Sequence, residues 1–76
     1  MDEQVLQILS EVSGVPAENL SPETRLLGDL GLSSFDLADT VVMVEETYGV
    51  HIPDERFREL ETVADILRVV REANAP

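Results

Sequence analysis

Apolar residues recur at helical spacing in three separate stretches of this chain, and each stretch is predicted to form a helix with one buried side. The expected helices cover residues 2–13, 34–49 and 62–73. In each stretch the apolar side chains follow one another at helical intervals, which places them along one side of the helix. They are Val5, Ile8, Leu9 and Val12 in the first stretch, Leu37, Val41, Val44 and Tyr48 in the second, and Val63, Ile66, Leu67 and Val70 in the third.

The expected helices have residues suited to helix ends at their boundaries. Gly14 and Gly49 favour the left-handed conformation that commonly follows the last helical residue. Thr62 and Asp65 have the spacing of a capping box at the start of the last helix, although Glu is more usual than Asp at the second position. These residues fix where the predicted helices begin and end.

The connecting segments predict a long loop and one short helix. Residues 15–33 contain two Pro and two Gly, and they are expected to form an ordered loop in which Ser21-Pro22-Glu23 opens a single helical turn. Residues 54–60 are expected to form a short third helix. Five leucines can attach the loop to the core, namely Leu20, Leu26, Leu27, Leu30 and Leu32.

These elements predict an all-α fold, a small four-helix bundle with three main helices, one short third helix and a long loop between helices one and two. Residues 1–76 are expected to form a single domain with a modest core. The chain has no Cys, so the core must rest on apolar packing from a composition that is 43% hydrophobic.

The charge of the chain narrows the classes of partner. Sixteen acidic residues against five Arg and no Lys give a net charge of −11, which disfavours nucleic acid and anionic membranes and favours protein partners with basic docking patches. No apolar run approaches the length of a membrane span, and the N-terminus lacks the pattern of a signal peptide. A cytoplasmic, monomeric protein is expected.

A serine at the start of the second helix is the most informative position for function. Asp29-Leu30-Gly31-Leu32-Ser33-Ser34-Phe35-Asp36 leads from the loop into that helix. The free N–H groups and the positive end of the dipole at a helix N-terminus would favour a phosphate attached to a serine there. The alternative is that Ser33 is an ordinary N-cap with Asp36 as its capping-box partner.

The surrounding sequence resembles the phosphopantetheine attachment region of the acyl carrier protein family. The resemblance includes Asp29-Leu30-Gly31 before Ser34, and it continues through Glu45-Glu46, Thr47-Tyr48-Gly49-Val50, Ile52-Pro53-Asp54 and Thr62-Val63. It implies that a phosphopantetheinyl transferase moves 4'-phosphopantetheine from coenzyme A onto Ser34. The thiol of that arm would then carry acyl, polyketide or aminoacyl intermediates as thioesters, and the chain itself would perform no catalysis.

Two residues depart from the pattern of the fatty-acid carriers in this family. Ser33 stands where those carriers usually have Asp, and Phe35 stands where they usually have Leu. Neither change removes the Ser34 hydroxyl. They make a specialised carrier, such as one for polyketide or aminoacyl intermediates, at least as plausible as a carrier of fatty acid synthesis.

The second helix also carries a mixed acidic and apolar side beside Ser34. Steps of 100° per residue place this side opposite the apolar stripe, and it consists of Phe35, Asp36, Asp39, Val42, Met43 and Glu46. Its carboxylates can steer a basic partner, such as a ketosynthase-type or other acyl-transferring enzyme, while its apolar groups supply contact. The alternative is a solvated helix face with incidental apolar residues.

Other chemistry finds little support in the sequence. His51 is the only His, so no His cluster can bind a transition metal. A hydrolase site is also disfavoured, because the sequence has no evident oxyanion-hole motif or substrate cleft to accompany a Ser–His pair. No segment matches a calcium-binding loop. The rival hypothesis is therefore an unmodified acidic helical adaptor, which would bind a protein without carrying a covalent group.

Overall fold

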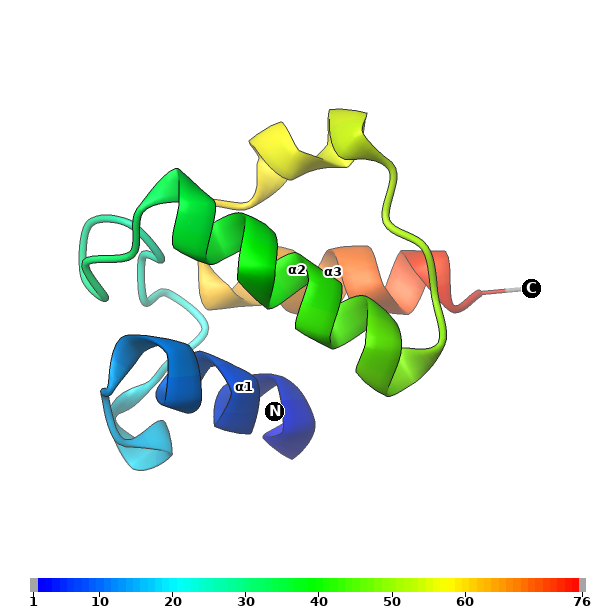
Figure 1. The fold of residues 1–76 in the computed structure, drawn as a ribbon. Coiled ribbons are helices and arrows are strands. Elements are labelled where there is room, and N and C mark those ends of the chain that lie inside the picture. Colours follow the sequence, from blue (N-terminus) through cyan, green and yellow to red (C-terminus); the bar gives the residue numbers. More distant parts are fainter. Residues whose placement is uncertain (1, 76) are drawn as a thin grey trace.

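The computed structural model describes residues 2–75, and its helices form a small bundle (Figure 1). Figure 1 shows α2 running across the front of the molecule with α3 behind it and α1 beside it. The predicted all-α fold is confirmed. The three α-helices are α1 (Glu3–Ser13), α2 (Ser34–Tyr48) and α3 (Val63–Ala73), and two 3-10 helices, η1 (Ala17–Asn19) and η2 (Asp54–Glu59), lie between them.

The helix ends follow the capping chemistry expected from the sequence. Gly14 and Gly49 adopt left-handed conformations, with φ of 78° and 66°. The side chain of Thr62 accepts from the Asp65 amide, and Asp65 accepts from the Thr62 amide, which completes the predicted capping box of α3. The first helix has an N-cap that the sequence analysis did not single out, because the Asp2 carboxylate accepts from the amides of Gln4 and Val5.

The core lies between the three α-helices and includes three leucines of the long loop. One polar residue, Thr40, is also buried there, and its hydroxyl donates to the Asp36 carbonyl over 2.9 Å. The buried apolar residues are Val5, Ile8, Leu9, Leu20, Leu26, Leu32, Leu37, Val44, Ile52, Leu60, Val63, Ile66, Val69 and Val70. The core therefore draws on every α-helix and on the loop before α2.

Two expectations for the long loop are wrong. Its helical turn is η1, whereas Ser21 instead begins a tight turn closed by the Thr24 amide on the Ser21 carbonyl. Leu27 is 49% exposed and does not attach the loop to the core. Loop leucines alone do not reveal which side chains point inward, because this depends on the dihedral angles of each turn.

The loop is attached to the start of α3 by backbone hydrogen bonds. The Leu26 amide donates to the Glu61 carbonyl over 2.9 Å, and the Val63 amide donates to the Thr24 carbonyl over 3.0 Å. These bonds surround an isolated antiparallel bridge between Arg25 and Thr62. The segment that leads to α2 is therefore fixed against a distant part of the chain.

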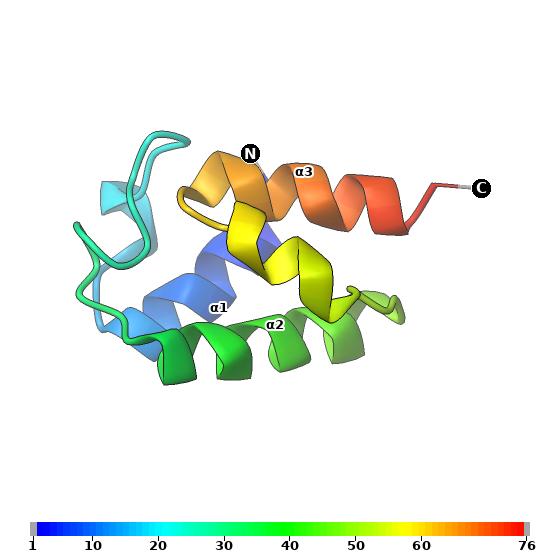
Figure 2. The ribbon, with the colours of Figure 1, turned by 90° about the horizontal axis from the view of Figure 1, so that it is seen from above.

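The predicted short third helix exists as η2, in the tighter 3-10 form. Viewed from above in Figure 2, η2 lies across the space between α2 and α3. Pro53 is the residue before it and Leu60 the residue after it, and its length of 6 residues is in keeping with the short runs in which 3-10 helices occur. Within residues 2–75 no helix has both the length and the apolar character to cross a membrane.

Candidate functional site

Ser33 is the N-cap of α2, and its side chain is already engaged. The Asp36 amide donates to the Ser33 hydroxyl over 3.1 Å, and the Ser33 amide donates to the Asp36 carboxylate over 3.0 Å. These reciprocal bonds form a complete capping box. The capping interpretation of Ser33 and Asp36 is therefore correct, and it assigns the cap to Ser33 alone.

Ser34 is the first residue of α2, and its side chain is exposed. Among residues 2–75 the Ser34 hydroxyl has no hydrogen-bond partner, and the amides of Ser34 and Phe35 donate to no acceptor. Free N–H groups at the positive end of a helix dipole favour an anionic group on the adjacent side chain. The position thus combines a free nucleophilic hydroxyl with unpaired donors.

Buried leucines on both sides hold Ser34 in place. Leu32 precedes it and is buried, and its amide donates to the Leu26 carbonyl. Leu37 follows it on the first turn of α2 and is 2% exposed. Gly31 adopts a φ of 71°, a conformation that costs Gly little and lets the chain turn from the loop into the helix. Ser34 is therefore a surface residue on an anchored backbone.

The exposed side of α2 contains four of the six residues predicted to form it. Phe35 is 76% exposed and Val42 is 51% exposed, while Asp39 and Glu46 are also exposed. The outward side of α2 thus presents both apolar surface and carboxylates close to Ser34. We call Phe35, Asp39, Val42 and Glu46 the α2 face.

The other two predicted residues have different surroundings. Met43 is half-buried and packs against the core, so it is less exposed than the sequence pattern indicates, and its contact with a partner stays a prediction. Asp36 is half-buried with its carboxylate engaged in the capping box. The buried arc of α2 is centred nearer Thr40 and Val44 than the apolar pattern indicates, because Thr40 satisfies its hydroxyl within the helix and can be buried.

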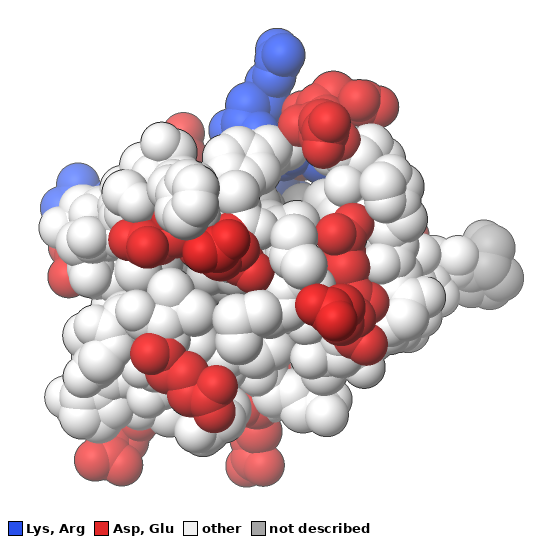
Figure 3. Space-filling model, in the orientation of Figure 1, with Lys and Arg blue, Asp and Glu red and all other residues white. Residues whose placement is uncertain are grey.

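Charge is distributed unevenly over the molecule. Neither α1 nor α2 contains Arg or Lys. Figure 3 shows carboxylates spread over the face that α1 and α2 present, with basic side chains near its upper and left edges. A protein with a basic surface would therefore be attracted to the side of the molecule that carries Ser34.

Glu45 has a role that the sequence analysis missed. Its carboxylate accepts from the Ile52 amide over 2.7 Å and lies 3.3 Å from Nδ1 of His51. His51 is thus placed as an exposed neighbour of a carboxylate, on the segment that leaves α2. A helical pattern cannot reveal this contact, because the partner is a backbone amide in the following connector.

Four clefts on the surface are lined by residues other than Ser34. A cleft of about 400 Å³ includes Asp2, Tyr48 and Arg71 and lies at the opposite end of α2. Burial raises the pKa of Tyr48 to about 12, with a further contribution from Asp2. Across residues 2–75 no three metal-ligating side chains cluster together. Ser34 is thus exposed and does not line any of these clefts.

Comparisons with known proteins agree with this geometry. The family model described as a phosphopantetheine attachment site matches residues 3–70. An acyl carrier protein of Thermobifida fusca is 32% identical over 86% of this chain and 82% of its own length. Another, from Acidothermus cellulolyticus, is 36% identical over 88% of this chain and 80% of its own.

A solved structure shows the same fold. It is the solution structure of a hexanoyl acyl carrier protein from the actinorhodin polyketide synthase of Streptomyces coelicolor. Its sequence is 25% identical, its TM-score is 0.80, and the match covers 96% of this chain and 88% of that chain. The similarity spans the whole helical bundle.

This chain belongs to the acyl carrier protein family, whose members are carriers, and its covalent prosthetic group is 4'-phosphopantetheine. The structure fits such a group at the start of α2. A phosphodiester on the Ser34 hydroxyl would lie beside the unpaired amides of Ser34 and Phe35, and the neighbouring Asp36 carboxylate is held by the Ser33 amide.

Proposed function

We propose that Ser34 is the attachment residue and that residues 1–76 act as one monomeric, non-catalytic carrier domain. The observation that carries this proposal is the division between two adjacent serines. Ser33 uses its hydroxyl to cap α2, whereas the Ser34 hydroxyl is exposed and has no partner among residues 2–75. When bound, the arm supplies a thiol that holds the cargo as a thioester.

The α2 face is the surface that we propose for docking. Partners are a phosphopantetheinyl transferase and acyl-transferring enzymes, met in the cytoplasm, whose basic patches approach Asp39 and Glu46. Phe35 and Val42 then supply apolar contact next to the arm. A small face of this kind suits a carrier that must release each enzyme after transfer.

We further propose that the cargo belongs to a specialised pathway, such as polyketide or aminoacyl assembly. Ser33 and Phe35 depart from the fatty-acid pattern, and the similarity to the actinorhodin carrier supports this direction. Phe35 is the most exposed of the large apolar side chains in residues 2–75. It gives the partner of this carrier a larger apolar group to recognise than a Leu would.

Intact-mass measurement tests the attachment residue. The chain is incubated with coenzyme A, Mg²⁺ and a broad-specificity phosphopantetheinyl transferase, and we expect a mass gain of one arm. Ser34→Ala should gain none, because the hydroxyl that attacks the phosphate is absent. Ser33→Ala is the matched control and should still gain one arm.

Two outcomes would contradict the proposal. A gain in Ser34→Ala would assign the arm to another residue. If the chain without substitutions gains no mass, the acidic helical adaptor is favoured, which binds a protein without a covalent group. Helical circular dichroism of each variant verifies that a missing gain does not come from a missing fold.

A further inference from the structure

The helix η2 has few apolar contacts to keep it in place. None of its residues is buried, and its one apolar residue, Phe57, is half-buried against the core. Buried residues lie only outside its ends, at Ile52 and Leu60. Burial of apolar surface is the main force that fixes an element in a fold, so η2 needs another form of attachment.

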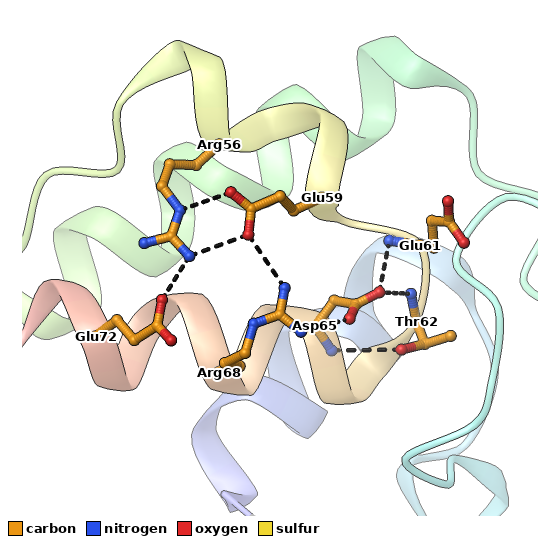
Figure 4. Close-up of polar contacts among 7 residues, drawn as sticks. All are labelled: Arg56, Glu59, Glu61, Thr62, Asp65, Arg68 and Glu72. Carbon is orange, nitrogen blue, oxygen red and sulfur yellow. Dashed lines mark hydrogen bonds and ion pairs between the residues drawn. The ribbon is translucent and has the colours of Figure 1, made fainter.

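Charged side chains supply that attachment (Figure 4). Arg56 of η2 pairs with Glu72 of α3, and Glu59 of η2 lies 3.2 Å from Nη2 of Arg68 of α3. Within η2, Arg56 and Glu59 form two parallel bonds of 2.9 and 3.1 Å. Five residues of alternating sign therefore form one continuous series, the ion chain, in the order Glu72, Arg56, Glu59, Arg68 and Asp65.

The ion chain continues into the N-cap of α3. Arg68 lies 2.9 Å from Asp65, whose carboxylate also accepts from the amides of Glu61 and Thr62. The Arg56 guanidinium holds the pKa of Glu59 below its usual range, so this carboxylate stays charged at neutral pH. Only two contacts in the series cross from η2 to α3, namely Arg56–Glu72 and Glu59–Arg68.

The segment before η2 is held in a different way. Glu45 of α2 accepts from the Ile52 amide over 2.7 Å, and Ile52 is itself buried. The connector is therefore fixed to α2 by burial and by a backbone bond. Residues 53–59, in contrast, have only the half-buried Phe57 against the core and are joined to α3 by two ion pairs.

We propose that the ion chain is a latch that holds η2 closed, and that η2 opens as a local unit when the latch is broken while the rest of the bundle stays folded. A cleft of about 180 Å³ lies between η2 and α2, with Val41 and Val42 on one wall and Phe57 on the other. Opening of η2 widens this cleft beside the α2 face. This conformational property is independent of whether Ser34 carries the arm.

Added salt should have different effects on the opening of η2 and on the global unfolding of the molecule. The ion chain consists of opposite charges that are partly exposed, so added salt weakens it. The rest of the molecule carries a large negative excess, so the same salt reduces its repulsion and stabilises it. Local opening of η2 and global unfolding should therefore respond to salt in opposite directions.

Amide hydrogen exchange of the whole chain tests the latch. The amides of Arg56 and Leu60 report on η2, because they donate to the Pro53 and Phe57 carbonyls. Amides of α1 report on global unfolding. In Arg68→Gln/Glu72→Gln, which leaves the sequence of η2 unchanged, the two η2 amides should exchange about three- to fivefold faster. The α1 amides should keep their rates.

A matched variant controls for the change in charge composition. Arg71→Gln/Glu23→Gln removes one positive and one negative charge as well, and neither residue forms an ion pair within residues 2–75. Exchange at Arg56 and Leu60 should stay as in the unmodified sequence. A threefold effect in this control as well would overturn the proposal.

A salt series on the chain without substitutions gives a second measurement of the latch. Between about 0.05 and about 0.5 M NaCl, a range that shortens the Debye length severalfold, the η2 amides should exchange faster and the α1 amides more slowly. The acceleration at η2 should be absent in Arg68→Gln/Glu72→Gln. Unchanged η2 rates in both experiments, or η2 and α1 rates that rise together, would show that no separate latch exists.

Discussion

Ser33 and Ser34 are adjacent and chemically identical, yet the fold gives them different tasks. Ser33 has the extended backbone of an N-cap, with φ of −85° and ψ of 168°, and turns its hydroxyl toward the Asp36 amide. Ser34 is already helical and points outward. The cap stabilises the helix that presents the next residue.

This difference predicts opposite effects of two alanine substitutions on stability. Ser33→Ala removes the N-cap and should lower the free energy of unfolding by about 1 kcal/mol, because the Asp36 amide loses its acceptor. Ser34→Ala should leave it nearly unchanged. Urea unfolding of the protein without substitutions and of both variants measures the difference in the free energy of unfolding. Equal losses in the two variants would contradict the separate roles.

The sequence could not fully decide between the two serines on physical grounds. A capping box is readable from Ser33 and Asp36, but Ser34 could serve as a plain N-cap without such a partner until the backbone angles are known. The family resemblance selected Ser34. The structure adds the physical reason, since only one of the two hydroxyls is free.

At the scale of elements, α2 joins Ser34, the proposed attachment residue, to the α2 face. Its start is fixed by the capping box and its end by Gly49 and by the hydrogen bond that the Ile52 amide donates to the Glu45 carboxylate. Phe35, Asp39, Val42 and Glu46 are thus carried on a helix that is anchored at both ends. If Ser34 carries the arm as proposed, a partner that binds this face would find the arm at a constant position along the helix.

Charge reversal on this helix should slow partner association. Asp39→Lys/Glu46→Lys replaces two exposed acids of the α2 face and should reduce the association rate with the phosphopantetheinyl transferase about tenfold or more at low salt. Stopped-flow binding measures this rate. The control is Glu23→Lys, which changes an exposed acid outside α2.

The salt dependence of that rate provides the decisive comparison. If the α2 face steers the partner, the difference between the double variant and the unmodified sequence should shrink as salt rises. Rates that are equal at low salt, or a loss of the same size in Glu23→Lys, would place the docking surface elsewhere. Circular dichroism should show the same helix content in all three proteins.

The periodic pattern predicted the helices well and their exposed sides less well. Leu37 and Val44 are buried as the pattern indicates, but Thr40 is buried beside them and Met43 is half-buried. A pattern of apolar letters cannot place Thr40 inward, because its hydroxyl is satisfied by a carbonyl of its own helix. The ion chain could not be predicted from the sequence either, because it joins residues of η2 and α3, and the relative position of these elements comes from packing.

At the scale of the whole molecule, net charge opposes compactness. A charge of −11 on 76 residues means that most pairs of charged groups repel each other. The five Arg partly offset this repulsion, and two of them, Arg56 and Arg68, are used within the ion chain. The modest core therefore has to fold against substantial repulsion.

Global stability should therefore increase with salt at neutral pH. The midpoint of thermal unfolding, followed by circular dichroism of the α-helices, should rise as NaCl is added, because screening weakens repulsion among the carboxylates. The same experiment with Glu11→Gln/Glu18→Gln, which removes two exposed acids, should start from a higher midpoint and show a smaller rise. A midpoint that falls with salt would show that attractive ion pairs dominate.

The backbone bonds between the long loop and the start of α3 have a consequence for synthesis on the ribosome. The Leu26 and Val63 amides need partners in segments that are far apart in the chain, at Glu61 and Thr24. A nascent chain that still has residues 61–63 inside the exit tunnel cannot make these bonds. The loop ahead of Ser34 can therefore reach its final arrangement only after residues 61–63 have left the tunnel, so a transferase that requires this arrangement would spare nascent chains that have not yet reached that point.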